Sequence, residues 1–242
     1  MTNSPMWGWP AWLMLLPVLV PLLGALVFGV LGWRPSTRWV GVVSAACVLG
    51  AAIAIAAGVT ASGPQVAFFS LLRVDALSAF LLIVIGAVAL ISAVATPSYL
   101  AVEVEAGRAD ERDCRHMVLL VQVFLALMAL AVLAAGLGVL WVAMEATTIV
   151  TAFLVGQRRG RAAVEAAWKY VVICSTGIAL ALLGTFLLNF AAQHTSPPAG
   201  LDWVDLVAAA PNLDPGVTRI AAALLIVGFG TKAGLAPLHA WL

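Results

Sequence analysis

Long apolar segments dominate this sequence and restrict what it can fold into. About twenty consecutive apolar residues in a helix cross the hydrocarbon core of a membrane, and seven segments of this kind occur along the 242 residues. Because a bilayer leaves no water to satisfy backbone polar groups, such segments must be helical. The sequence therefore predicts an all-α, polytopic integral membrane helix bundle. The predicted spans are 12–32, 39–60, 77–95, two within 117–156 that join at 136–138, 162–192, and one that begins near 217 and is still apolar at 242.

Composition supports the same class of protein. Apolar residues make up 64% of the chain, against roughly 45–50% in a soluble domain. With only 12 basic and 11 acidic residues, the chain has too little charge for a nucleic-acid-binding surface or a soluble enzyme. We expect a single transmembrane domain over 1–242, with three N-terminal helices (12–96) followed by helices four to seven (117–242). The chain stops inside its seventh predicted span, which is typical of a truncated sequence.

Basic residues are distributed unevenly between the predicted loops. Residues 1–11 carry no charged side chain, so they lack the basic leader of a signal peptide and the first span is expected to be retained. Because basic residues favour the cytoplasmic side, we expect the N-terminus outside and the chain in the inner (plasma) membrane of the cell. The loops predicted to lie inside hold eight basic residues: Arg34, Arg38, Arg108, Arg112, Arg115, Arg158, Arg159 and Arg161.

The cysteines form no recognisable ligand set. Cys47, Cys114 and Cys174 lie far apart and include no C-x-x-C pair, which argues against an iron–sulfur cluster, a structural zinc site or a disulfide scaffold. We therefore expect no cofactor and no metal in this chain.

Two ionisable residues lie deep inside predicted spans. Glu145 is near the middle of the fifth span, and Lys232 lies about 15 residues into the seventh, among Gly230, Gly234 and Pro237. A charge at such depth costs about 2.5–3.5 kcal/mol on insertion scales and usually marks a functional site. The glycines and the proline predict a break in the seventh helix between Lys232 and Pro237. Because broken backbone at this depth needs hydrogen-bond partners, we expect a water-filled cavity beside it. The alternatives are a structural carboxylate at Glu145, and a packing motif at Gly230 and Gly234 with a lysine that extends to the interface.

Two further residues are candidates for a proton path. Lys169 is about 10 Å inside the inner end of the sixth span, four residues after Glu165, a spacing that favours an ion pair on one helical face. His239 follows the predicted break and belongs to a residue type that titrates near neutral pH. Extension of Lys169 to the interface and simple packing of His239 are the alternatives.

Glu145 and Lys232 together suggest a mechanism. Burial disfavours the charged form of an amine, and a nearby carboxylate favours it. A movement that separates and rejoins the two side chains could therefore release and recapture a proton. We interpret the pair as a site for proton translocation by pKa switching.

Several ordered motifs resemble a known family. The segments 141–148 (WVAMEATT), 165–170 (EAAWKY) and 228–242, together with 73–78 (RVDALS), are similar to the antiporter-like, proton-conducting membrane subunits of respiratory complex I, Mrp antiporters and membrane-bound hydrogenases. The resemblance is greatest to the hydrogenase-4 component F type, on 166–169 and on 201–216. It covers the whole chain.

The resemblance implies a role for the candidate residues. Glu145 and Lys232 match the buried ion pair of the family, and Lys169 matches its basic residue in the sixth span. Family members have about fourteen spans arranged around two inverted repeats, so this chain corresponds to the N-terminal half. The implied function is that of a proton-translocating subunit, with no redox centre of its own, in a hydrogenase or complex I-like assembly of other membrane and peripheral subunits.

Other functions are compatible with parts of the pattern. A subunit of an Mrp-type cation/proton antiporter would use the same residues. A purely structural membrane scaffold would not depend on Glu145 and Lys232. A more distant alternative is a retinal-binding protein with Lys232 as the Schiff base, but the neighbours of this lysine are glycine, threonine and alanine instead of aromatic residues.

Overall fold

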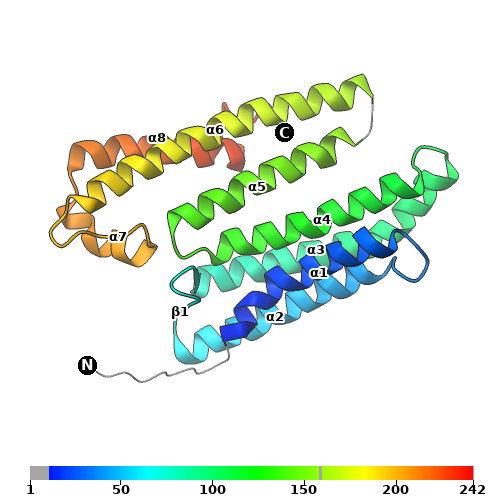
Figure 1. Ribbon diagram of the computed structural model, residues 1–242, viewed down its shortest axis with the longest axis horizontal. Helices are drawn as coiled ribbons and strands as arrows, with labels where there is room; N and C mark the ends of the chain where they lie inside the picture. Colours follow the sequence, from blue (N-terminus) through cyan, green and yellow to red (C-terminus); the bar gives the residue numbers. More distant parts are fainter. Residues whose placement is uncertain (1–10, 158–159, 242) are drawn as a thin grey trace. The chain divides into compact units, whose positions relative to one another are not determined.

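The computed structural model describes residues 11–157 and 160–241, and most of them are helical (Figure 1). Within these residues, seven helices are long and apolar enough to cross a membrane. This confirms the predicted all-α, polytopic fold. The helices are α1 (Leu16–Leu31, preceded by the 3-10 helix Ala11–Leu15), α2 (Val40–Ser62), α3 (Ala76–Glu105), α4 (Glu111–Leu133), α5 (Leu137–Gly156), α6 (Arg161–Gln193), the short α7 (Trp203–Ala209) and α8 (Pro215–Ala233).

Three features differ from the sequence prediction. The third span extends beyond residue 95, through Pro97, to the end of α3 at Glu105, and α4 already begins at Glu111, so most of the charged segment 103–116 is helical instead of a loop. A small antiparallel hairpin, β1 (Gln65–Ala67) and β2 (Leu72–Val74), joins α2 to α3. The predicted loop before the last span contains α7. The prediction used long runs of apolar residues, and short polar or amphipathic segments do not contain such runs.

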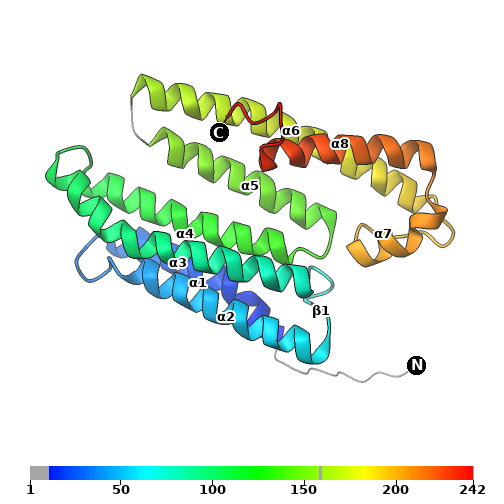
Figure 2. The same cartoon turned by 180° about the vertical axis from the view of Figure 1, so that it is seen from behind.

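The chain divides into two compact units, with the boundary between Leu133 and Ala134. The fourth helix packs with the three helices before it. In unit 1, α2 packs along α3, and α1 packs along α4 (Figure 2). Large buried side chains such as Ile55, Leu82 and Leu133 form its main core near the hairpin.

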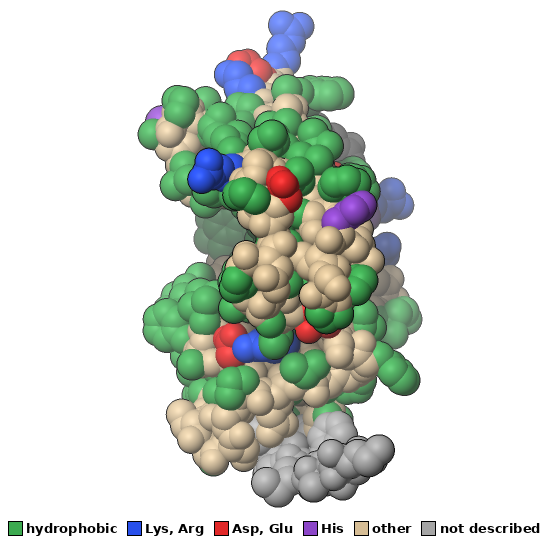
Figure 3. Space-filling view, turned by 90° about the vertical axis from the view of Figure 1, so that its left-hand side faces the viewer, with side chains coloured by type: hydrophobic (Ala, Val, Ile, Leu, Met, Phe, Trp, Pro, Cys, Tyr) green, Lys and Arg blue, Asp and Glu red, His purple; other side chains and the backbone are tan. Residues whose placement is uncertain are grey.

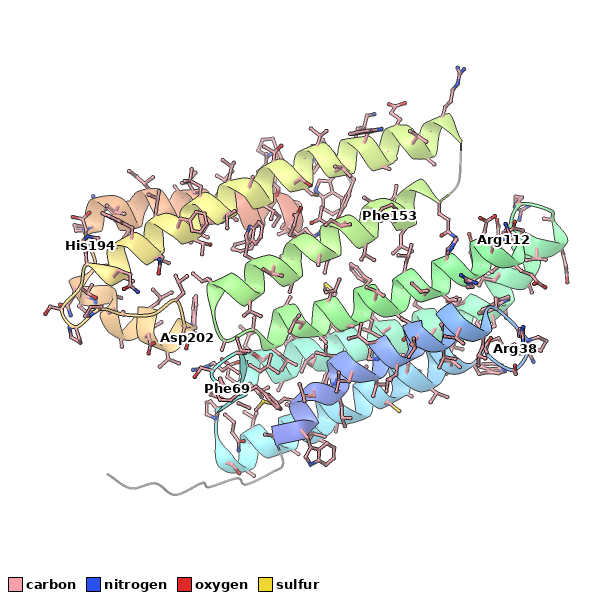
Figure 4. The ribbon with its side chains drawn as sticks, in the orientation of Figure 1. Arg38, Phe69, Arg112, Phe153, His194 and Asp202 are labelled. Atoms are coloured by element: carbon pink, nitrogen blue, oxygen red, sulfur yellow. The ribbon has the colours of Figure 1, made fainter. Side chains whose placement is uncertain are left out.

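The two ends of unit 1 differ in how many charged residues they carry. Arg38 and Arg112 lie at one end, and Phe69 in the β1–β2 turn lies at the other (Figure 4). The basic residues of the α1–α2 and α3–α4 connections therefore share one end, as the predicted topology requires. The predicted basic residues Arg158 and Arg159, and the uncharged N-terminal residues 1–10, fall outside the described residues.

The exterior suits a lipid environment. Large apolar side chains, among them Leu23, Ile91, Phe153 and Phe186, are more than half exposed. Figure 3 looks onto one end of the helices, where basic, acidic and histidine side chains lie between hydrophobic ones. Exposed apolar side chains on nearly every span are expected where lipid replaces water around a bundle.

In unit 2, α8 packs tightly against α6 in the antiparallel direction. The contacts pair Gly177 with Thr231, Ala181 with Gly228, and Gly184 with Ala221. An ideal Cβ on Gly228 would lie 2.6 Å from the backbone nitrogen of Ala181. Small residues of this kind allow helices to approach closely in membranes, where packing replaces the hydrophobic effect as the main attraction.

The connection between α6 and α8 is attached to the beginning of α5. The backbone N–H of Leu137 donates to the carbonyl of Leu201 at 3.2 Å, and the N–H of Trp203 donates to the carbonyl of Ala135 at 3.0 Å. Asp214 then begins α8 by accepting a hydrogen bond from Val217 N–H at 2.8 Å. His194 and Asp202 lie at this end of unit 2 (Figure 4).

We expect Gly228→Ala to destabilise unit 2. The added methyl group would meet the backbone of α6, which cannot move away without separating the two helices, and overpacking of this kind costs about 1–3 kcal/mol. Thermal unfolding in detergent measures the effect. The control is Gly50→Ala, because a Cβ at this helical position in α2 meets nothing within 4 Å; equal melting temperatures for the two variants would contradict the packing.

Asp75 makes the stability of α3 depend on pH. Burial by itself would raise its pKa, but hydrogen bonds from Ser78 and the charge of Arg73 outweigh it and hold the pKa below the ordinary 3.8. The carboxylate accepts the Ser78 N–H at 2.9 Å as the N-cap. Its stabilisation is complete at neutral pH and is lost as the pH falls through the lowered pKa.

We therefore expect Asp75→Ala to cost about 1 kcal/mol at pH 7, and the difference from wild type to become smaller well below pH 3.8, where the carboxyl is neutral. Asp75→Asn keeps the hydrogen-bond acceptor without the charge and should retain most of the stability with a weaker pH dependence. Unfolding curves collected across pH test this. A constant difference between Asp75→Ala and wild type at every pH would show that the carboxylate is not responsible.

Candidate functional site

The candidate site forms around Lys232, where α8 ends. Its ammonium group donates to the hydroxyl of Thr148 on α5 at 2.9 Å and to the hydroxyl of Tyr170 on α6 at 2.7 Å. All three residues belong to unit 2 and are buried or half-buried. The lysine thus links three helices that lie far apart in the sequence.

The helix positions of these residues place the site deep in the bundle. Thr148 is the twelfth of 20 residues in α5, or about 17 Å from the helix start at 1.5 Å per residue. Tyr170 is the tenth residue of α6, about 14 Å from its beginning. Since the hydrocarbon core is about 30 Å thick, α8 ends near the level at which α5 is halfway across.

The end of α8 is closed by turns and by a tryptophan. Gly234 adopts a left-handed conformation (φ 71°), which glycine tolerates without a Cβ clash, and Leu235 N–H donates to the carbonyl of Gly230 at 3.0 Å. The indole N–H of Trp241 donates to the carbonyl of Thr231 at 2.8 Å. The predicted break near Lys232–Pro237 therefore corresponds to the end of the helix at Ala233.

Two features of this helix end favour a positive charge. The carbonyl end of a helix carries partial negative charge, and Lys232 is in the last turn of α8. The ammonium group also lies 5.3 Å from the centre of the Tyr170 ring, at a distance typical of a cation–π contact. Trp241 packs edge-on against the same ring, with 5.2 Å between the ring centres.

Glu145 lies one helical turn before Thr148 but does not pair directly with Lys232. No carboxylate oxygen of Glu145 comes within 4.0 Å of the lysine nitrogen, and its Oε2 atom is buried without a hydrogen-bond partner among the described residues. The two charges are still near enough to interact electrostatically. The expected close pair is thus replaced by hydrogen bonds from the lysine to Thr148 and Tyr170.

The other predicted residues lie away from this cluster. Lys169 pairs with Glu165 at 2.6 Å, as the spacing of four predicted, and both side chains are more than 60% exposed. His239 is exposed in the turns after α8. The structure therefore brings together Lys232 and the α5 helix that carries Glu145, but it does not bring Lys169 or His239 to them.

Tyr170 and Trp241 belong to the site although the sequence pattern does not mark them as site residues. Tyr170 follows Lys169 but lies about 100° further round α6, so it is buried while its neighbour is exposed. The one feature of the sequence that could have pointed to Tyr170 is its type: it is one of only two tyrosines in the chain and lies inside an apolar span. Trp241 follows the end of the apolar helix and could be placed against Tyr170 only after the turns between them were known.

A tryptophan fixes α5 against α6 next to the site. The indole N–H of Trp141, one turn before Glu145, donates to the carbonyl of Ile178 at 2.8 Å. Ile178 follows Gly177, which contacts Thr231 of α8. The three helices are therefore held together within two turns of Lys232.

Comparison with known proteins identifies the family. Residues 134–242 match the family described as NADH:quinone oxidoreductase/Mrp antiporter, transmembrane. A hydrogenase-4 component F homolog of Methylacidiphilum infernorum is 34% identical over 72% of this chain and 37% of that protein. The chain belongs to the antiporter-like membrane subunit family. A further relative, F(420)H(2) dehydrogenase subunit N of Methanosarcina mazei, is 33% identical over 72% of this chain and 33% of that protein.

Solved structures share the fold. A chain of the membrane-bound sulfane sulfur reductase, an archaeal respiratory membrane complex, matches with a TM-score of 0.77 at 22% identity, over 96% of this chain and 46% of that one. A chain of the Mrp complex from Dietzia sp. matches with a TM-score of 0.72 at 22% identity, over 96% of this chain and 43% of that chain. The antiporter-like chain thus matches less than half the length of each of these proteins. The retinal-binding alternative is not supported.

We expect Tyr170→Phe to destabilise the antiporter-like chain by about 1.5–3 kcal/mol, because the charged amine would lose one of its two hydrogen-bond acceptors. The apparent melting temperature in detergent measures this loss. Trp168→Phe is the matched control: it alters an aromatic side chain of α6 that is 65% exposed and should change the stability by less than about 0.5 kcal/mol. A tyrosine variant as stable as the control would show that the Lys232 contact contributes nothing.

Proposed function

We propose that this chain is a proton-translocating membrane subunit of a redox-driven complex of the hydrogenase-4 or complex I type. The observation that carries the proposal is the placement of the Lys232 ammonium group near mid-membrane, between Thr148 and Tyr170, one turn from an unpartnered Glu145 oxygen. Ionisable groups at such depth normally mark an ion path or a proton relay. The relatives named as hydrogenase-4 and F(420)H(2) dehydrogenase components favour a redox-driven parent complex.

The proposed mechanism uses two positions of Lys232. In the position described, two neutral hydroxyl groups hold the amine and Glu145 stays apart. In the second position, the flexible lysine side chain moves one helical turn and pairs with Glu145, which stabilises the charged form of both groups. Alternation between the two positions changes the proton affinity of the pair and so allows uptake in one state and release in the other.

Glu145 is the group that most needs a second state. A buried carboxylate oxygen without a donor is rare, because burial without a hydrogen bond costs about 1–3 kcal/mol and more for a charge. A water molecule or the Lys232 ammonium would donate to the Oε2 atom, and a proton would remove its charge. Each of these events belongs to a step of a proton-transfer cycle. The missing hydrogen bond to Oε2 therefore supports this mechanism.

Lys169 and His239 are proposed as outer members of the path. Lys169 and Glu165 form an exposed pair within the first three turns of α6, where they could collect protons from the inner side. His239 lies seven residues beyond Lys232, past the end of α8, and could pass a proton onward. Both roles require water between these residues and Lys232.

The proposed function requires partner subunits, because the sequence shows no ligand set for a redox centre. The chain would receive its driving force from partner subunits that transfer electrons, as a change in conformation or charge. We place it in the plasma membrane with the N-terminus outside, because the basic ends of the spans favour the cytoplasmic side.

We expect Lys232→Ala to abolish most proton uptake by inverted membrane vesicles that contain the complete parent complex and are driven by its electron donor. Lys232→Arg keeps the positive charge and should retain part of the uptake. Glu145→Gln should also reduce uptake severalfold. Glu105→Gln, at the exposed end of α3, is the control and should leave uptake unchanged.

The result is decisive only if the complex assembles, so subunit content is measured in the same vesicles. Wild-type uptake and turnover in Lys232→Ala would refute the mechanism and leave a structural role. Sodium-dependent proton exchange without an electron donor, lost in Lys232→Ala, would instead favour an Mrp-type antiporter, a family whose solved complex shares the fold.

A further inference from the structure

The two hydroxyl groups that hold Lys232 differ in where their own hydrogen atoms can go. An ammonium group has only donors, so the hydroxyls of Thr148 and Tyr170 both accept from it, at 2.9 Å and 2.7 Å. Each hydroxyl still carries a hydrogen of its own. A proton passes through a hydroxyl only if this hydrogen can leave on the other side, so its partner decides whether the group can relay a proton.

Thr148 donates its hydrogen to its own helix. Its hydroxyl bonds to the carbonyl oxygen of Met144 on α5 at 3.1 Å. A carbonyl oxygen accepts a hydrogen bond but has no hydrogen to pass on. Thr148 can therefore hold Lys232, but the hydrogen-bonded chain ends there.

Tyr170 has a different environment. Within residues 11–157 and 160–241, no backbone carbonyl accepts a hydrogen bond from its hydroxyl. The side chains of Thr151 on α5 and Cys174 on α6 lie beside the hydroxyl and interact with it. Oxygen is the stronger acceptor of the two, since a thiol accepts hydrogen bonds only weakly. The Tyr170 hydrogen is therefore directed away from Lys232, toward Thr151.

Thr151 lies closer than Thr148 to the end of α5. It precedes the last residue of the helix, Gly156, by five positions, or about 7–8 Å, and it is half-buried. A Cβ on Gly156 would lie 3.6 Å from the Cβ of Ala167, which is one turn before Tyr170 on α6. A proton that leaves Tyr170 toward Thr151 thus moves toward the end of unit 2 at which α5 ends and α6 begins.

We propose that Tyr170 is a proton relay that connects Lys232 to this end of unit 2. The inference rests on the proposed function, because it assigns a route to one step of the Lys232 cycle. When Lys232 gives up a proton, an N–H bond breaks and a new O–H bond forms on Tyr170, while the original Tyr170 hydrogen passes to a water molecule beside Thr151. The reverse sequence returns a proton to the amine. The phenol is neutral before and after each transfer.

The two positions of Lys232 control this relay. When the amine moves one helical turn to pair with Glu145, it leaves Tyr170, and the hydrogen-bonded chain is interrupted. A proton that has passed through Tyr170 then cannot return by the same route. The relay itself stays in place, because the buried Tyr170 ring packs against Trp241 with 5.2 Å between the ring centres.

The first test separates proton transfer from simple holding of Lys232. Tyr170→Phe should lower proton uptake by vesicles with the complete parent complex at least about tenfold, since a positioned proton-transfer group contributes roughly 10²–10⁴-fold to a rate. Tyr170→Gln offers an amide oxygen that accepts from Lys232 but has no hydrogen to relay, whereas the ring of Tyr170→His can both accept and donate. We expect uptake to stay low in Tyr170→Gln and to recover severalfold in Tyr170→His.

The second test examines the direction of the relay. Thr151→Val removes the hydroxyl at little change in shape and should lower uptake severalfold. Thr60→Val is the matched control: the hydroxyl of Thr60 also donates to a carbonyl of its own helix, as that of Thr151 does, but it is exposed and belongs to unit 1. Uptake in Thr60→Val should equal that of wild type.

Uptake is normalised to the subunit content of the vesicles, and Lys232→Ala is measured in parallel. If Lys232→Ala abolishes uptake but Tyr170→Phe leaves it at the wild-type level, the relay is overturned and the proposed function remains. If Tyr170→His shows no more uptake than Tyr170→Gln, Tyr170 only holds the lysine, and the relay is overturned as well. Wild-type uptake in Lys232→Ala would overturn both the relay and the proposed function.

Discussion

The charge of Lys232 near mid-membrane is the constraint on which unit 2 depends. An ammonium group at this depth needs acceptors, and no single helix can supply them. Thr148 on α5 and Tyr170 on α6 do so, and the carbonyl end of α8 adds a favourable dipole. The same helix end exposes carbonyl groups in the membrane, which the turn at Gly234 and the indole of Trp241 satisfy. The carbonyl end of α8 thus stabilises the charge of Lys232, and the charge in turn favours a helix that ends at this point.

Close helix packing makes this arrangement possible. Because Gly177 and Gly228 have no side chain, α6 and α8 approach until Thr231 and Ala181 fill the space. This approach sets the distance between Tyr170 and Lys232, and the Trp141 hydrogen bond to Ile178 holds α5 at the same level. The rigid contacts surround a lysine that is itself long and flexible. Such a combination suits a group that changes partners while its surroundings stay fixed.

The relation between Glu145 and Lys232 shows what residue spacing can and cannot predict. Both residues stand out because charge is rare in apolar spans, and the structure places Lys232 against Thr148, one turn after Glu145 on α5. Sequence could not show that neutral hydroxyl groups take the place of the carboxylate in the state described. Lys169 illustrates the opposite case: its pairing with Glu165 is local to one helix and was predictable, but its distance from Lys232 depends on which face of α6 is buried.

The sequence by itself determined the membrane spans, the uneven distribution of basic residues, the break after Lys232 and the depth of the two buried charges. These properties depend on hydrophobicity and on local backbone preferences, which act over a few turns of helix. Only the tertiary structure decided that Tyr170 and Trp241 complete the site and that α4 packs with the N-terminal helices. Those features depend on contacts between distant segments, because the rotation of each helix about its axis follows from packing against its neighbours.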